Sequence, residues 1–407
     1  MIINFKVKNF YSIKEEQEIS FSITKKDKKD DSSFLSECGN LLNNTIAIVG
    51  HNASGKTNVL KALSFCLWFV KNSYEMLPNG KVSILGVMPH KLSKSDISSF
   101  EMIFENNNRE FQYKLDISRK GVQYEFLGEK KQRGYSVVYE LKRTETEDNF
   151  MHFNLPMLNK GDKDRFAMRK NISLFSFLQN TGHLPEFGLT ELTKFESNLG
   201  FLGKSMQDST QIFLQLRNTI DKNSERFSKI LKFLRRMDFS IEDIVDKDEY
   251  VPFTNVTNPG DVRQVKNIIF KHSSGESTFD LDFFNESNGT QRMLLLLDRI
   301  FQTLEKGGIL VSDEIETSIH PMVIRELIKL FADDSNNQKH AQIIFSTHIP
   351  LLLEDRNKTQ IYLVEKNEEL SSEIYRLDDV EGVRNDDNFC NKYLAGAYGA
   401  IGNIRRI

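Results

Sequence analysis

The chain has 407 residues, which is enough for one large core or for two to three compact units. Its composition, with 39% hydrophobic residues, 27% charged residues and a net charge of −3, is that of a soluble protein and does not indicate a strongly basic nucleic-acid binder, although a local basic patch stays open. The longest apolar run, Ala62 to Val70, is too short to cross a bilayer, which excludes a membrane transporter.

Residues 1–150 are predicted to form the N-terminal part of an α/β core. Residues 1–22 alternate apolar and polar side chains, which predicts two strands joined at residues 9–12. The apolar run at residues 46–49 predicts a buried strand, and helical spacing follows from Asn58 to about Lys71. From Phe100 to Lys142 four runs with a period of two predict an antiparallel meander.

Residues 151–250 are predicted to be a helical insertion between the two halves of this core. Two apolar stripes, at residues 212–220 and 227–234, follow the i, i+3, i+4 spacing of amphipathic helices. These stripes fit two interpretations, internal packing or a partner-binding arm, and packing is favoured.

Residues 251–407 are predicted to complete the core. Strand patterns at residues 265–271 and 279–284 precede a buried helix at residues 291–301. Two further apolar strands, at residues 308–311 and 342–345, flank a helix, which predicts a parallel crossover and an α/β fold.

A phosphate-binding motif lies between the predicted strand and helix near residue 50. Residues 50–57 read G-x-x-x-x-G-K-T, in which glycines let backbone N–H groups close around phosphate oxygens at a helix N-terminus. Lys56 is expected to reach the outer phosphates, and the Thr57 hydroxyl to hold Mg²⁺. The residues predicted to bind the nucleotide are Gly50, Asn52, Ala53, Ser54, Gly55, Lys56, Thr57 and Asn58.

Two later strands end in polar residues. Asp313 and Glu314 follow an apolar strand, and we expect Asp313 to bind Mg²⁺ and Glu314 to act as the base for an attacking water. Without a phosphate loop, such a pair is more simply a solvated strand end. His348 follows the next strand, which places it at the same sheet edge, where it is expected to contact a γ-phosphate.

A further candidate loop opens the helix near residue 290. Ser287, Asn288 and Gly289 form either a plain helix cap or a second phosphate-binding helix end. One chain cannot easily place both helix ends on one γ-phosphate. Two chains arranged head to tail can do so.

The order and spacing of these motifs resemble those of ABC-type ATPases, in the branch of the SMC and Rad-fifty heads. Residues 313–321 resemble the D-E-I-E-x-x-[LI]-H-P stretch of stand-alone AAA/ABC ATPases, and residues 9–12 and 393–401 resemble end motifs of the RloA-like and abortive-infection (AbiL-like) proteins, often found in phage-defence operons.

The resemblance implies an ABC-type head with an antiparallel β subdomain and a helical insertion. It implies that residues 50–57 are Walker A, that Asp313 and Glu314 are Walker B, and that His348 is the switch histidine. Residues 287–290 would be the signature, written S-N-G-T instead of S-G-G-Q. His320 stands where transporters carry Asp, and a Q-loop glutamine is not evident near residues 89–91.

These features lead us to expect a Mg²⁺-dependent ATPase that forms ATP-linked homodimers or higher oligomers and controls a separate nuclease-like or toxin-like effector. Cys38, Cys66 and Cys390 suit reduced thiols, and no signal peptide is evident, so a cytoplasmic location without a membrane partner is expected. One alternative is a DNA-repair ATPase that clamps nucleic acid, for which residues 160–170 offer some positive charge. Another is a scaffold that uses ATP only as glue.

Overall fold

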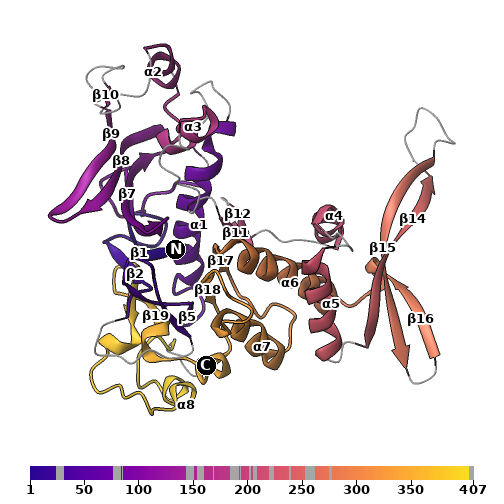
Figure 1. Cartoon of the computed structure of the whole chain (residues 1–407). Helices are drawn as coiled ribbons and strands as arrows, with labels where there is room; N and C mark the ends of the chain where they lie inside the picture. Colours follow the sequence, from indigo (N-terminus) through magenta and orange to yellow (C-terminus); the bar gives the residue numbers. More distant parts are fainter. Residues whose placement is uncertain are drawn as a thin grey trace. The chain divides into compact units, whose positions relative to one another are not determined.

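A computed structural model of the chain divides into two compact units. Unit 1 comprises Met1–Ser205, Lys306–Ile315 and Ile328–Ile407, and unit 2 comprises Met206–Glu305 and Glu316–Leu327 (Figure 1). The structure describes residues 1–23, 32–76, 84, 86–143, 151–153, 160–167, 169–183, 192, 194–200, 203–204, 209–219, 224–237, 240–252, 262–274 and 277–402.

The centre of unit 1 is a six-stranded sheet in the order β11-β17-β18-β5-β19-β20. All neighbouring strands in it run parallel except β19 and β20. Its strands are β5 (Thr45–Val49), β11 (Phe195–Ser197), β17 (Ile309–Ser312), β18 (Gln342–Ser346), β19 (Ile361–Lys366) and β20 (Ser372–Arg376). Every residue of β5, β17 and β18 is buried, as expected for apolar runs in a sheet covered on both faces. The predicted parallel strands are thereby confirmed.

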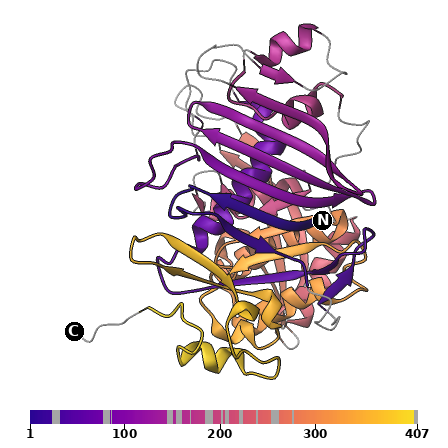
Figure 2. The ribbon, with the colours of Figure 1, turned by 90° about the vertical axis from the view of Figure 1, so that its left-hand side faces the viewer.

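A second, antiparallel sheet in unit 1 confirms the predicted meander. Its order is β10-β9-β8-β7-β6-β1-β2. The strands are β1 (Ile2–Lys8), β2 (Gln17–Ser20), β6 (Ser98–Asn106), β7 (Arg109–Ser118), β8 (Gly121–Lys131), β9 (Gly134–Arg143) and β10 (Met151–Phe153). One apolar core contains side chains from both sheets and from α1 (Lys56–Asn72). Figure 2 shows the strands of this sheet in front of α1.

Shorter elements complete unit 1. They are β3 (Ser33–Leu35), β4 (Leu41–Asn43), β12 (Leu199–Gly200), β13 (Gly203–Lys204), α2 (Lys160–Ala167), α3 (Leu174–Asn180) and α8 (Phe389–Leu394), with 3₁₀ turns at 73–75, 350–353, 358–360 and 377–379.

A buried carboxylate fastens α3 to the antiparallel sheet. Glu125 of β8 accepts hydrogen bonds from the Ser173 hydroxyl (2.7 Å) and the backbone N–H groups of Leu174 (2.7 Å) and Phe175 (3.2 Å). The Tyr139 hydroxyl donates a further bond at 3.0 Å. Burial raises the pKa of Glu125 despite these donors. The first turn of α3 thus depends on one side chain from β8.

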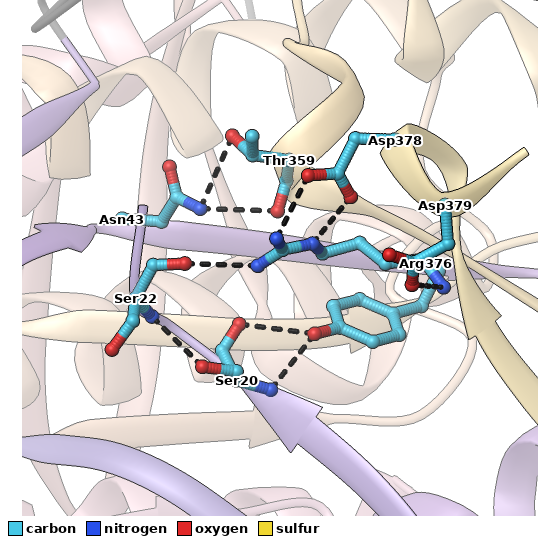
Figure 3. A network of polar contacts seen from close by, with 8 residues as sticks. Ser20, Ser22, Asn43, Thr359, Arg376, Asp378 and Asp379 are labelled. Carbon is cyan, nitrogen blue, oxygen red and sulfur yellow. Dashed lines mark hydrogen bonds and ion pairs between the residues drawn. The ribbon is translucent and has the colours of Figure 1, made fainter. Parts of the chain in front are cut away.

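Polar contacts connect the N-terminal residues Ser20 and Ser22 to β19 and β20 of the six-stranded sheet, in the region shown in Figure 3. Arg376 donates to both carboxylate oxygens of Asp378 (2.5 and 2.8 Å) and to the Ser22 carbonyl (2.8 Å). The Ser20 N–H donates to the Tyr362 hydroxyl at 2.8 Å, and this hydroxyl donates to the Ser20 carbonyl at 3.1 Å. Segments more than 340 residues apart in the chain are therefore held edge to edge.

Unit 2 consists of helices and a three-stranded antiparallel sheet. Phe213, Phe270 and Phe283 contribute to its apolar core. Its elements are α4 (Ser209–Thr219), α5 (Glu225–Arg236), β14 (Ile241–Pro252), β15 (Val262–Ser274), β16 (Ser277–Asp282), a 3₁₀ turn (Phe283–Asn285), α6 (Asn288–Lys306, of which Lys306 belongs to unit 1) and the first part of α7 (Pro321–Ala332).

The region predicted as a helical insertion, residues 151–250, contains strands as well as helices. Helices α2 to α5 lie in it, together with β10 to β13 and most of β14. Residues 240–244 were expected to close the helical region, but residues 241–244 begin β14, because a long partner strand, β15, pairs with them. Ile220, expected in a helical stripe, lies outside the described residues. The boundaries at residues 150 and 250 remain a prediction of domain organisation. None of the described helices has the length and hydropathy needed to cross a bilayer.

Candidate active site

The phosphate loop connects β5 to α1 and is closely packed in unit 1. A Cβ atom added to Gly50 would lie 2.2 Å from the Val364 carbonyl oxygen of β19. A Cβ atom added to Gly55, whose φ is +114°, would lie 2.0 Å from the Ser372 hydroxyl. Only glycine fits at either position, because any side chain would displace the neighbouring strands.

Lys56 stands at the start of α1 and is folded back over the loop. Its ammonium group donates to the carbonyl oxygens of Gly50 (2.8 Å) and His51 (3.0 Å). The side chain is buried, with 5% of the residue exposed. The lysine is therefore held over the first half of the loop, whose backbone is suited to surround phosphate oxygens.

Asp313 and Thr57, 256 residues apart in the chain, are in contact at the start of α1. The Thr57 hydroxyl lies 3.2 and 3.0 Å from the two carboxylate oxygens of Asp313. The Ser346 hydroxyl donates to the same carboxylate at 2.6 Å. Asp313 is almost fully buried. Hard oxygen donors gathered in this way fit Mg²⁺, which prefers carboxylate and hydroxyl oxygens with water.

Glu314 and His348 lie beside this cluster and are partly exposed. The distance between His348 Nε2 and Glu314 Oε1 is 3.6 Å. Glu314 has a φ of +44°, a conformation uncommon outside glycine, and its N–H donates to the Ser346 hydroxyl at 2.7 Å. The two adjacent acids therefore differ in their surroundings. Asp313 is buried, whereas Glu314 faces solvent and His348.

Two supports of the carboxylate cluster were missed by the sequence analysis. The Asn198 side chain donates to the Asp313 carbonyl (2.7 Å) and accepts from the Asp313 N–H (2.8 Å). Ser346 bonds to both acidic residues, as described above. Asn198 stands 115 residues before Asp313 and offers no local signal. Ser346 is the last residue of β18 and belongs to the polar strand end that drew attention to His348, so the end of β18 was a usable clue.

The remaining residues predicted to bind the nucleotide are either exposed or connected to a chain of serine contacts. Ser372 donates to the Ser54 carbonyl at 2.6 Å and bonds to Ser12 at 2.7 Å, and Asn58 donates to Ser12 at 2.7 Å. Asn52 and Ala53 are exposed, and Ala53 has a φ of +62°. The motif at residues 9–12 is thus linked to the phosphate loop through Ser12, by way of Ser372 and Asn58.

The residues of the predicted signature belong to unit 2. The Ser287 hydroxyl accepts from the Thr290 N–H at 3.0 Å and caps α6. A Cβ atom added to Gly289 would lie 2.8 Å from the Ser318 carbonyl oxygen, so the loop packs against residues that follow the acidic pair. Asn288 is exposed.

A hydrogen bond between β15 and the residue before Ser287 anchors this loop. His272 Nε2 lies 2.5 Å from Glu286 Oε1, and both side chains are at most 10% exposed. The Phe279 ring stacks on His272 with centroids 5.1 Å apart. This contact joins β15 directly to the start of the predicted signature.

Comparison with known proteins assigns the family. Residues 46–354 match the family described as "AAA domain, putative AbiEii toxin, Type IV TA system". The chain belongs to this AAA-domain family. It is therefore an ATPase of the AAA/ABC type, as expected, whereas membership of the RloA-like or AbiL-like group stays a prediction.

A curated relative of this AAA-domain protein is the "Retron Vc95 probable ATPase" of Vibrio cholerae serotype O1 biovar El Tor. It is 22% identical over 363 residues, which cover 79% of this chain and 69% of the relative. Solved structures that resemble the chain include the SMC head domain from Thermotoga maritima (16% identity, TM-score 0.43, covering 92% of this chain and 98% of that chain) and the Smc head domain with a coiled coil and joint from Pyrococcus yayanosii (11% identity, TM-score 0.43, covering 97% and 99%).

Proposed function

We propose that this AAA-domain protein binds and hydrolyses ATP with Mg²⁺, closes into a dimer around the nucleotide, and controls a separate effector in anti-phage defence. The observation that supports hydrolysis best is the meeting of Thr57, Asp313, Glu314 and His348 beside a closely packed phosphate loop.

In the proposed reaction, the loop backbone and Lys56 bind the β- and γ-phosphates. Glu314 accepts a proton from water as the water oxygen forms a bond to the γ-phosphorus. The bond from that phosphorus to the bridging oxygen breaks, and ADP and phosphate result. His348 orients the γ-phosphate or the water. Thr57 and Asp313 would hold Mg²⁺, which when bound neutralises charge on the phosphate oxygens.

The hydrolysis proposal is tested by measuring phosphate release from purified protein. Lys56→Ala is expected to abolish turnover, because the outer phosphates lose their cation. Unchanged turnover in this variant would contradict the proposed site. A wild-type protein that oligomerises with ATP but releases no phosphate would favour the scaffold alternative.

The proposed dimer places the Ser287–Gly289 loop of one copy on the nucleotide of the other. The dipole of α6, whose N-terminus carries this loop, favours a negative phosphate there. The test is complementation between Lys56→Ala, which keeps its signature, and Ser287→Arg, which keeps its phosphate loop. Each variant alone is expected to be inactive, and their mixture to recover turnover. A mixture as inactive as its parts would contradict action in trans.

The proposed role in defence rests on the retron relative, whose name links an ATPase of this kind to a retron. We propose a cytoplasmic protein whose effector is a nuclease-like or toxin-like partner. Capture of the tagged protein from phage-infected and uninfected cells tests this role. A cytoplasmic nuclease or toxin that co-purifies in a nucleotide-dependent manner would support it, and loss of phage protection in Lys56→Ala cells should accompany it.

A further inference from the structure

The C-terminal residues Tyr393–Gly402, here called the tail segment, line a pocket beside the phosphate loop. The pocket has a volume of about 490 Å³. His51 and Asn52 of the loop line it together with His348, and the tail segment contributes Tyr393, Ile401 and Gly402 among other residues. The tail segment therefore bounds part of the site on the side of His348, the predicted switch histidine.

The tail segment is held in a constrained conformation. Gly399 has a φ of +74°, and a Cβ atom added there would lie 2.7 Å from the Tyr375 hydroxyl. Ala400 has a φ of +55°, which costs free energy for a residue other than glycine, and its N–H donates to Glu365 at 3.1 Å. The Tyr375 hydroxyl donates to the Tyr398 carbonyl at 2.9 Å. Unfavourable backbone conformations persist where surrounding contacts enforce them, commonly near functional sites.

One peptide group connects the tail segment to the catalytic lysine. The N–H of His51 donates to the Ala400 carbonyl at 2.9 Å. The carbonyl of the same peptide group, that of Gly50, accepts from the Lys56 ammonium at 2.8 Å. Because a trans peptide is planar with its N–H and C=O pointing in opposite directions, fixing one group fixes the other.

We propose that the tail segment is a positioning element of the ATP site. The Ala400 carbonyl sets the orientation of the Gly50–His51 peptide and, through it, the position of Lys56. This inference rests on the proposed ATP site. By linkage, a nucleotide that draws Lys56 toward its phosphates must also change the stability of the contact between His51 and Ala400.

The first test compares two glycine-to-alanine variants of the full chain. Gly399→Ala forces a side chain against the Tyr375 hydroxyl and should displace Ala400. Gly382→Ala is the matched control, since Gly382 has a similar φ of +81° but no atom within 4 Å of an added Cβ. Gly399→Ala is expected to weaken ATP binding about three- to tenfold, the effect of losing one or two hydrogen bonds. It should raise KM more than it lowers kcat, and Gly382→Ala should match the wild type.

The second test measures hydrogen exchange of the wild type and of Lys56→Ala with and without ATP. ATP is expected to change amide protection at His51 and in the tail segment of the wild type, but not in the lysine variant. If Gly399→Ala fails to fold, Tyr393→Phe replaces it in the binding assay, because this variant removes a 3.4 Å hydrogen bond to the Ala400 carbonyl. It should give a smaller loss of affinity in the same direction.

The outcomes separate this inference from the proposed function. Wild-type protein that binds ATP, with unchanged affinity in Gly399→Ala or Tyr393→Phe and unchanged exchange in the tail segment, would overturn the positioning role alone. Wild-type protein that does not bind ATP would overturn both.

Discussion

The Thr57 hydroxyl lies 3.0 Å from a carboxylate oxygen of Asp313. If these oxygens hold Mg²⁺, Asp313→Asn should raise the Mg²⁺ concentration needed for half-maximal turnover by about ten- to a hundredfold, because the amide carries no negative charge. A titration of phosphate release against Mg²⁺ measures this shift, and chelation should stop turnover in the wild type. Asp378→Asn, which changes an acid of the same unit bound to Arg376, is the control and should leave the titration unchanged. Equal Mg²⁺ requirements for wild type and Asp313→Asn would contradict the assignment.

Glu314→Gln is expected to slow hydrolysis by about a hundredfold or more, because the amide cannot accept the proton of the attacking water. ATP binding should remain, since the phosphate loop is untouched. The variant should therefore accumulate as an ATP-bound dimer, visible by light scattering coupled to size exclusion. A Glu314→Gln protein that stays monomeric with ATP and Mg²⁺ would argue against nucleotide sandwiched between two copies.

His272→Ala should loosen the start of α6, because it leaves the buried Glu286 without the histidine. The loss of such a partner costs about 1–3 kcal/mol of unfolding free energy. Thermal unfolding and exchange of amides at residues 286–290 measure the effect, and His272→Gln, which keeps a donor, should recover part of it. If the signature acts in trans, His272→Ala mixed with Lys56→Ala should regain turnover, as in the complementation experiment. Unchanged exchange at residues 286–290 in His272→Ala would show that the contact between His272 and Glu286 does not anchor this loop.

Glu125 predicts a specific pH dependence of stability. Its folded-state pKa is raised above the ordinary value of 4.5, so the native state binds the proton more tightly than the unfolded chain does. The contribution of this group to stability is therefore largest below pH 4.5 and decreases as pH rises toward the raised pKa. Denaturant unfolding from pH 4 upward measures this slope. Glu125→Gln lacks this titrating group, so the unfolding free energy of the variant relative to the wild type should rise as pH rises. A relative unfolding free energy that stays constant with pH would rule out the predicted shift.

Features carried by consecutive residues could be predicted from the sequence. One short stretch predicted the strand before Gly50, the loop and α1, because it contains an apolar run, the glycines and Lys56 of the motif, and the helical spacing of apolar residues. The meander between residues 100 and 142 was recognisable for the same reason, since alternation is a local pattern.

Contacts made by the fold alone could not be predicted. Nothing near Asn198 marks it as the partner of the Asp313 backbone, and nothing near Ala400 indicates that its carbonyl meets His51. The sequence did not reveal that residues 241–244 begin β14. They pair with the end of β15, and this pairing extends beyond the short stretch in which periodicity predicted a strand.

The order of strands in the central sheet has a consequence for synthesis of the protein. The Thr45 hydroxyl at the start of β5 accepts from Gln360, which is translated 315 residues later. At ribosomal speeds, the apolar strand β5 waits about 15 to 60 s for its neighbours β18 and β19. The nascent chain therefore needs protection from aggregation during that interval, and fragments ending before β18 should be recovered as insoluble material unless a chaperone holds them.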